Sequence, residues 1–164
     1  LNFVKKTGLV QKYGISVYSP EEVYEITDQI GIDLVQLPMN IFDQRFLNSG
    51  CLKYLSQNNI EVHARSLFLQ GALLASNTPN LLLNWDSYFI RLRKRCEELG
   101  VSLLEYCIDF ANSALCEGSS IVIGVTSRKE LSDIVGVISR ETYKENWEDF
   151  ACDEIRLIDP RKWN

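Results

Sequence analysis

The stretch Ile32-Asp-Leu-Val-Gln-Leu37 is a short apolar run that breaks into polar residues at its carboxyl end. Three other runs share this character: Tyr13-Gly-Ile-Ser-Val-Tyr18, Ile60-Glu-Val-His-Ala-Arg-Ser66 and Ser120-Ile-Val-Ile-Gly-Val125. Helix-length segments separate them, and strands that alternate with helices form parallel sheets through crossover connections. The sequence therefore predicts an α/β fold of four consecutive parallel βα units. The expected strands are 13–17, 32–37, 60–64 and 120–125.

Polar signals mark where the helices should begin. Ser19 stands before Pro20 and two glutamates, which is a typical helix start because serine caps free N–H groups and proline fits the first turn. Ser102-Leu-Leu-Glu105 is a capping box for a helix over about 103–114, which follows a helix over about 85–99. Ser127 is expected to begin the last helix. That helix should turn four apolar side chains inward: Leu131, Ile134, Val135 and Ile138.

The tail over residues 141–164 contains three large aromatic side chains, Trp147, Phe150 and Trp163. It is too aromatic for a free linker, so we expect it to pack on the body. A chain of 164 residues is typical of one domain, which predicts a single domain over 1–164. Because the first residue is Leu1 rather than Met, we expect the chain to be cut from something longer.

Composition narrows the class of protein. With 46% hydrophobic and 24% charged residues the chain has an ordinary globular composition. Its net charge of −5 argues against nucleic acid as a partner, since phosphate binding needs clustered Lys and Arg. No apolar run approaches the ~20 residues that span a bilayer, so we expect no membrane segment. The five cysteines include no C-x-x-C pair, which predicts reduced thiols in a cytoplasmic protein and no metal site.

Polar side chains at the strand ends are the candidate ligand-binding groups, because ligands of parallel sheets bind at the carboxyl ends of the strands. They are Ser16, Gln36 with Asn40, Arg65 with Ser66, and the stretch Gly124-Val-Thr-Ser127. A structural role stays open for each, and an amide inside an apolar strand needs a hydrogen-bond partner in either case. The last stretch precedes a helix, whose N-terminus favours anions, but it forms no P-loop or G-x-G-x-x-G motif.

The sequence offers no clear catalytic constellation. His63 is the single histidine, and strand alternation places it on the same face as Glu61 and Arg65. No nucleophile elbow, metal triad or carboxylate pair accompanies it. We therefore assign no catalytic residue and no metal ligand.

Taken in order, four segments resemble the C-terminal half of an aldo/keto reductase. They are Gly14-Ile-Ser-Val-Tyr-Ser-Pro20, Asp33-Leu-Val-Gln-Leu-Pro-Met-Asn-Ile-Phe-Asp-Gln-Arg45, His63-Ala-Arg-Ser-Leu-Phe-Leu-Gln-Gly71 and Ile123-Gly-Val-Thr-Ser127. The closing Leu157-Ile-Asp-Pro-Arg-Lys-Trp163 is similar to the end of a bacterial subgroup. The resemblance implies half of a (β/α)8 TIM barrel, strands five to eight, with extra helices and a C-terminal tail.

The resemblance also implies a nicotinamide cofactor, NAD or NADP, bound across the carboxyl ends of the strands. Ser16 and Gln36 would bind the carboxamide, and Arg65 stands where many members stack a Tyr on the nicotinamide. The pyrophosphate would lie along Ser66, Phe68 and Gln70, and the adenosine end along Gly124, Val125, Thr126 and Ser127. Gly124 and Glu130 lie where many NADP-dependent members have Lys and Arg, which favours NAD or a mixed preference, although Arg128 or Lys129 could substitute for those basic residues. At Val17 the chain departs from the family's usual Asn.

Two functions follow from this resemblance. The first is an NAD(P)H-dependent oxidoreductase, of which this chain supplies the cofactor-binding half. The family's catalytic Asp, Tyr, Lys and His come from strands one to four and are not expected here. The alternative is a catalytically inactive, truncated half-barrel that binds a nucleotide or a partner protein.

A half-barrel should expose two strand edges, and unpaired edges invite pairing. Its inner face is expected to be apolar, at Ile15, Val35 and Val122 or their neighbours. The sequence thus predicts association with the missing half or a homodimer.

Overall fold

The computed structural model describes residues 2–140 and 145–163. Its centre is a four-stranded parallel sheet with the strands in chain order, β1-β2-β3-β4. The strands are β1 (Gly14–Ser16), β2 (Leu34–Pro38), β3 (Glu61–Arg65) and β4 (Ser120–Ile121). Successive strands lie side by side because each crossover returns the chain to the same edge of the growing sheet. The expected parallel α/β arrangement is confirmed.

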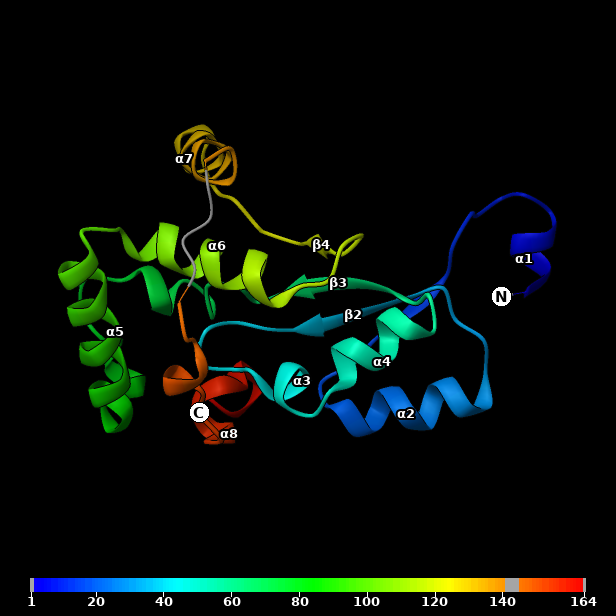
Figure 1. Cartoon of the computed structure of the whole chain (residues 1–164), viewed down its shortest axis with the longest axis horizontal. Helices are drawn as coiled ribbons and strands as arrows, with labels where there is room; N and C mark the ends of the chain where they lie inside the picture. The colour runs from blue at the N-terminus through cyan, green and yellow to red at the C-terminus, as the bar shows by residue number, and fades with distance from the viewer. Residues whose placement is uncertain (1, 141–144, 164) are drawn as a thin grey trace.

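Helices follow each strand. The α-helices are α1 (Asn2–Lys6), α2 (Pro20–Gln29), α3 (Arg45–Asn48), α4 (Cys51–Gln57), α5 (Asp86–Leu99), α6 (Leu103–Ala114), α7 (Arg128–Ile138) and α8 (Ile155–Ile158). Short 3-10 helices cover Ala72–Leu74, Asn80–Trp85, Glu148–Phe150 and Pro160–Lys162. In Figure 1, α1 lies beyond the amino ends of the strands and α5 beyond their carboxyl ends.

The predicted helix starts are confirmed. The hydroxyl of Ser19 accepts a hydrogen bond from the N–H of Glu22, and Ser127 accepts one from Glu130. At α6 the capping box is complete, since Glu105 also accepts a hydrogen bond from the N–H of Ser102 at 2.7 Å. These bonds satisfy N–H groups that the first turn of a helix leaves unpaired.

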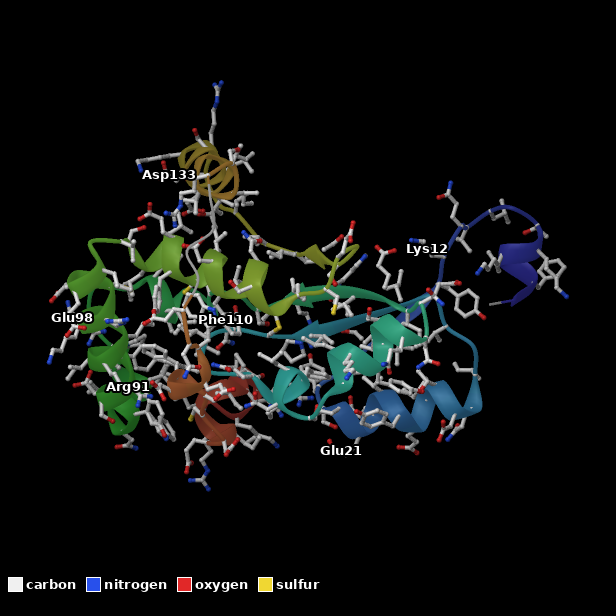
Figure 2. The ribbon with its side chains drawn as sticks, in the orientation of Figure 1. Lys12, Glu21, Arg91, Glu98, Phe110 and Asp133 are labelled. Carbon is white, nitrogen blue, oxygen red and sulfur yellow. The ribbon has the colours of Figure 1, made fainter. Side chains whose placement is uncertain are left out.

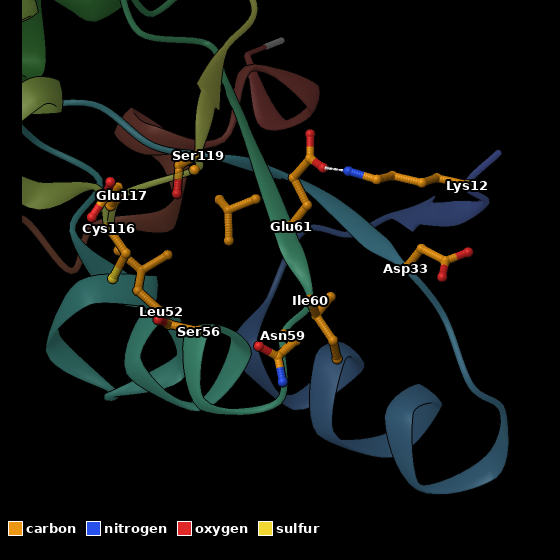
Figure 3. Close-up of a pocket in the computed structure, with 12 residues that line it drawn as sticks. Lys12, Asp33, Leu52, Ser56, Asn59, Ile60, Glu61, Cys116, Glu117 and Ser119 are labelled. Atoms are coloured by element: carbon orange, nitrogen blue, oxygen red, sulfur yellow. Dashed lines mark hydrogen bonds and ion pairs between the residues drawn. The ribbon is translucent and has the colours of Figure 1, made fainter.

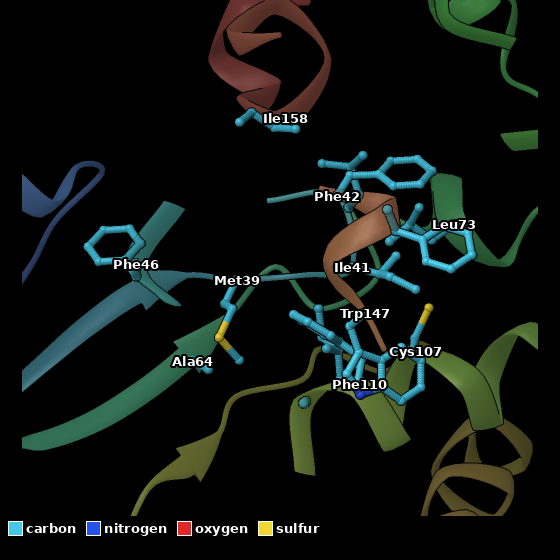
Figure 4. Packing of buried hydrophobic residues seen from close by; sticks show 14 of the residues in the cluster. Met39, Ile41, Phe42, Phe46, Ala64, Leu73, Cys107, Phe110, Trp147 and Ile158 are labelled. Atoms are coloured by element: carbon cyan, nitrogen blue, oxygen red, sulfur yellow. The ribbon is translucent and has the colours of Figure 1, made fainter. Parts of the chain in front are cut away.

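The core lies between the sheet and its helices. Val35 and Leu37 of β2 have no exposed surface, and they belong to one cluster with Phe46 and Leu55. Figure 4 shows this packing around Met39, Phe42 and their neighbours. On the outside, the charged side chains of Arg91 and Glu98 extend from α5, whereas Phe110 of α6 lies within the body (Figure 2).

The expectation that Val35 faces an apolar inner surface is wrong. Side chains alternate between the two faces of a strand, and the face of Val35 is the one that the core buries. The opposite face of β2 and β3 carries half-buried polar side chains: Gln36, Glu61, His63 and Arg65. The inner face of β2 and β3 is therefore polar, whereas Val122, which lines the same groove as Gln36 and Arg65, is apolar as expected.

The fourth βα unit is less complete than the sequence predicts. Of the expected strand 120–125, β4 includes only Ser120–Ile121, and the N–H of Val122 adds one more bond to Ala64. The expectation that the apolar side chains of α7 face inward is confirmed at Ile134, which is 8% exposed, and is wrong at the other three positions. The other three side chains expected to face inward are about half exposed: Leu131 (50%), Val135 (53%) and Ile138 (48%). Within the described residues α7 packs mainly against α6, so one side of the helix stays uncovered.

Residues 145–163 lie against the body of the chain, whereas 141–144 and 164 of the predicted tail fall outside the described residues. Trp147 and Phe150 are buried, with their rings 4.8 and 5.8 Å from the ring of Tyr106. Two hydrogen bonds fasten this segment: Gln44 Nε2 donates to the carbonyl of Trp147, and the N–H of Cys152 donates to Phe42.

All five cysteines are free, and four are buried. Burial raises the pKa of Cys51 to about 11 and that of Cys96 to about 12, so both thiols stay protonated at neutral pH.

Leu37→Ala tests the placement of the core. Removing this buried side chain is expected to lower the free energy of unfolding by about 2–5 kcal/mol, because it loses apolar burial and leaves a cavity. The matched control Leu81→Ala, at a side chain that is 58% exposed, should change it by less than about 0.5 kcal/mol. Urea unfolding followed by circular dichroism measures both; equal effects would contradict the assignment.

Candidate functional site

Parallel register brings the first two predicted site residues together. Ser16 pairs with Gln36, and Gln36 pairs with His63, so the three lie in one row across the sheet. Adjacent strands are ~4.8 Å apart, which places the side chains of Ser16 and Gln36 next to each other on the polar face. Neither side chain forms a hydrogen bond with another of the described residues. Their hydroxyl and amide groups are thus available to a ligand.

A groove of about 610 Å³ lies at the carboxyl ends of the strands. Nine predicted site residues line it: Gln36, Arg65, Ser66, Phe68, Gln70, Gly124, Val125, Thr126 and Glu130. Its volume is in the range typical of cofactor sites, ~300–1,000 Å³. Of the other two predicted residues, Ser16 lies beside Gln36, and Ser127 caps α7 without lining the groove. Lining residues that the prediction omitted are Leu67, Gly71, Leu74, Val122 and Ile123.

The loop after β3 has an unusual backbone. Ser66, Leu69 and Gln70 have positive φ angles of 62°, 47° and 56°, and Gly71 follows at 84°. Left-handed residues other than glycine are uncommon and strained, and they cluster at binding sites. The buried Leu69 and an N–H bond from Leu69 to the carbonyl of Ser66 hold the loop. In sequence the only signal of this conformation was Gly71.

Asn40, which the sequence grouped with Gln36, has a structural position. It is fully buried and does not line the groove. Its amide oxygen accepts hydrogen bonds from the N–H groups of Phe42 and Asp43, both at 3.0 Å. Its amide nitrogen donates to the carbonyl of Ser66 at 3.3 Å. Asn40 therefore joins the loop after β2 to the loop that walls the groove.

Arg65 brings a positive charge to the groove. Its guanidinium donates hydrogen bonds to the hydroxyl of Ser66 at 3.3 Å and to the carbonyl of Val17 at 3.2 Å. It also lies over the ring of Tyr18, with Cζ 4.4 Å from the ring centre. Among the described residues no carboxylate pairs with it. A half-buried, unpaired guanidinium suits an anionic or planar ligand.

The other wall of the groove ends in a negative charge. The carboxylate of Glu130 accepts hydrogen bonds from the N–H of Thr126 at 2.7 Å and from its hydroxyl at 3.0 Å. The hydrogen bond from the N–H of Thr126 is the main reason that the pKa of Glu130 is lowered. Glu130 is therefore ionised at neutral pH, beside the N-terminus of α7.

A second cavity of about 470 Å³ lies at the amino ends of the strands (Figure 3). Three of its charged side chains are paired: Lys12 with Glu61, which also accepts from His63 at 2.8 Å, and Asp33 with Lys5. The hydrogen bond from Lys12 lowers the pKa of Glu61. Because parallel sheets bind ligands at the opposite, carboxyl ends, this cavity is the weaker candidate.

Over residues 2–140 and 145–163, no three His, Cys, Asp or Glu side chains gather as metal ligands would. No helix within those ranges is long and apolar enough to cross a bilayer.

A sequence model of the Aldo/keto reductase family matches residues 1–154. No curated protein matches the chain. Among solved structures, an aldo-keto reductase from Bacillus halodurans in its apo form is similar, with 17% identity and a TM-score of 0.72 over 91% of this chain and 52% of that one. An aldo-keto reductase from Bombyx mori in complex with NADP is also similar, with 13% identity and a TM-score of 0.61 over 99% of this chain and 54% of that one.

The chain thus spans about half the length of the solved structures it resembles. Its four parallel βα units correspond to half of their (β/α)8 barrel, as the sequence predicts.

Proposed function

The chain belongs to the aldo/keto reductase family, and we propose that it supplies the nicotinamide-nucleotide-binding half of an NAD(P)H-dependent oxidoreductase. The observation that supports this most is the groove at the carboxyl ends of the strands. It gathers residues from three separate βα units, and it lies beside a hydroxyl and an amide with no partner among the described residues. In this proposal residues 1–164 form one half-barrel domain.

The groups present fit a dinucleotide. The Ser16 hydroxyl and the Gln36 amide suit a carboxamide, which needs both a donor and an acceptor. Arg65 suits a flat ring, because a guanidinium stacks on aromatic faces. The strained loop from Ser66 to Gly71 would offer backbone N–H groups to phosphates. When bound, the reduced nicotinamide supplies a hydride.

We place the proton donor outside this chain, in a complementary half-barrel with strands one to four. A guanidinium is too weak an acid to donate the proton and a glutamine amide does not ionise, so neither Arg65 nor Gln36 supplies it. His63 lies in the same row as Gln36, but its ring is bonded to Glu61 and it does not line the groove. On this account the chain binds the nucleotide by itself and needs the complementary half for turnover.

The cofactor we favour is NAD. A bound NADP would bring its 2′-phosphate to the adenosine end of the groove, where Glu130 holds a negative charge beside Thr126. Like charges at close range repel. The buried free thiols are consistent with the cytoplasmic location that we propose.

The second candidate function is a catalytically inactive half-barrel that binds a partner or a nucleotide. The half-exposed stripe Leu131, Val135 and Ile138 on α7 favours it, because soluble proteins seldom leave apolar side chains clustered in water. The partner we propose is the missing half or, for the chain alone, a second copy.

Gln36→Ala tests the nucleotide site. One hydrogen bond is worth ~1 kcal/mol, so the substitution is expected to weaken NADH binding by roughly three- to tenfold. Fluorescence titration of NADH measures the dissociation constant. The control Gln57→Ala, at an exposed residue of α4, should leave it unchanged. Equal affinity of Gln36→Ala and the unsubstituted chain would refute the assignment.

Glu130→Gln tests the cofactor preference. The neutral amide keeps the shape of the cap and removes the charge, so binding of NADPH relative to NADH should improve by roughly two- to fivefold. Glu148→Gln, at an exposed residue of the 3-10 helix Glu148–Phe150, is the control with the same charge change. An unchanged ratio of the two affinities would show that Glu130 does not face the 2′ position.

Sedimentation of the chain alone tests the partner surface. A homodimer with twice the chain mass of 18.8 kDa is expected. The double substitution Leu131→Lys with Val135→Lys should convert it to a monomer, because it puts charge on the apolar stripe of α7. The control is the same pair of substitutions at Leu81 and Leu83, which are also exposed. A monomer from the unsubstituted chain would contradict this part of the proposal.

A further inference from the structure

Three segments that are distant in sequence meet on the ring of Tyr18. Tyr18 follows β1, Arg65 ends β3, and Arg161 belongs to the 3-10 helix Pro160–Lys162 of the C-terminal segment. The Cζ atom of Arg161 lies 3.3 Å from the centre of the Tyr18 ring, and that of Arg65 lies 4.4 Å from it. Two guanidinium groups therefore share one aromatic ring at the edge of the groove.

Arg161 is held firmly at its own end of this stack. The side chain of Asp159 is 6% exposed and accepts hydrogen bonds from Arg161 Nε at 2.9 Å and Nη2 at 2.6 Å. The N–H of Arg161 also donates to Asp159 at 3.1 Å. Leu157 and Ile158, directly before Asp159, are buried in the core. The core thus fixes the carboxylate, and the carboxylate fixes the guanidinium.

Charge makes the stack attractive rather than repulsive. The carboxylate of Asp159 offsets the charge of Arg161, and the carboxylate of Glu22 accepts a hydrogen bond from the N–H of Tyr18 at 2.7 Å. A cation over an aromatic ring gains ~0.5–2 kcal/mol. Arg161 thereby holds the ring of Tyr18, and Glu22 holds its backbone.

Arg65 depends on that ring. It has no carboxylate partner among the described residues, and a long side chain loses up to ~2 kcal/mol of rotamer entropy when it is fixed. Within residues 2–140 and 145–163, its other contacts are the hydroxyl of Ser66 and the carbonyl of Val17.

We propose that Arg161 is a positioning residue: through Tyr18 it fixes the guanidinium of Arg65 at the nicotinamide end of the groove. The C-terminal segment then sets the affinity for the nicotinamide half of the cofactor without touching it. This inference rests on the proposed cofactor site.

The test compares two ligands, NADH and ADP-ribose, which lacks the nicotinamide. Arg161→Ala is expected to weaken NADH binding by roughly three- to tenfold and to leave ADP-ribose binding unchanged, because only the nicotinamide end loses its support. General loosening of the fold would weaken both ligands alike. Lys162→Ala removes the same charge from the neighbouring exposed position and should change neither affinity.

Two further variants keep the test decisive if Arg161→Ala folds poorly. Tyr18→Leu removes the shared ring and should reproduce the selective loss of NADH binding. In an Arg65→Ala background, Arg161→Ala should have no additional effect, since the two substitutions break one chain of contacts.

Unchanged NADH affinity in Arg161→Ala, or equal weakening of both ligands, would overturn the inference and leave the proposed function intact. Failure of the unsubstituted chain to bind NADH would overturn both.

Discussion

The alternation of side chains along β2 and β3 is the constraint on which the rest of this molecule depends. Val35, Leu37, Val62 and Ala64 are buried in the core, and the side chains between them must then point to the other face. A register slip of one residue would bury Glu61, His63 and Arg65 and expose the core, so the pairing is strongly specified. The same alternation that stabilises the sheet also aims Gln36 and Arg65 at the groove.

The groove follows from what happens where the strands end. The carboxyl ends of parallel strands lie at the same end of the sheet, so the loops after β2, β3 and β4 meet there. Asn40 ties the first two loops together, and Ser127 with Glu130 fixes the turn before α7. Hydrogen bonds within and between these loops therefore hold the walls, whereas the side chains of Ser16 and Gln36 have no such partner within the described residues. A site built this way is rigid around its rim and open to a ligand at its centre.

The sequence predicted what depends on local pattern. The helix over 103–114 and the caps at Ser19, Ser102 and Ser127 match because hydrogen bonds within one turn decide them. The prediction failed where a segment distant in sequence determines the structure. The strand β4 is shorter than predicted, and the apolar stripe of α7 is uncovered, because the burial of α7 depends on which segments lie beside it. The contact between Tyr18 and Arg161 could not be predicted from sequence either, because the two residues are 143 positions apart in the chain. The left-handed backbone of Ser66, Leu69 and Gln70 could not be predicted either, because these residue types do not indicate that conformation.

The measurement that tests the central claim most directly is a map of backbone amide chemical shifts by NMR as NADH is added to the chain. The account predicts that the shifts concentrate at the carboxyl-end groove, with Gly71 and Gly124 among the resonances that move most. Shifts concentrated at the amino-end cavity, around Asn59 and Gly118, would contradict it.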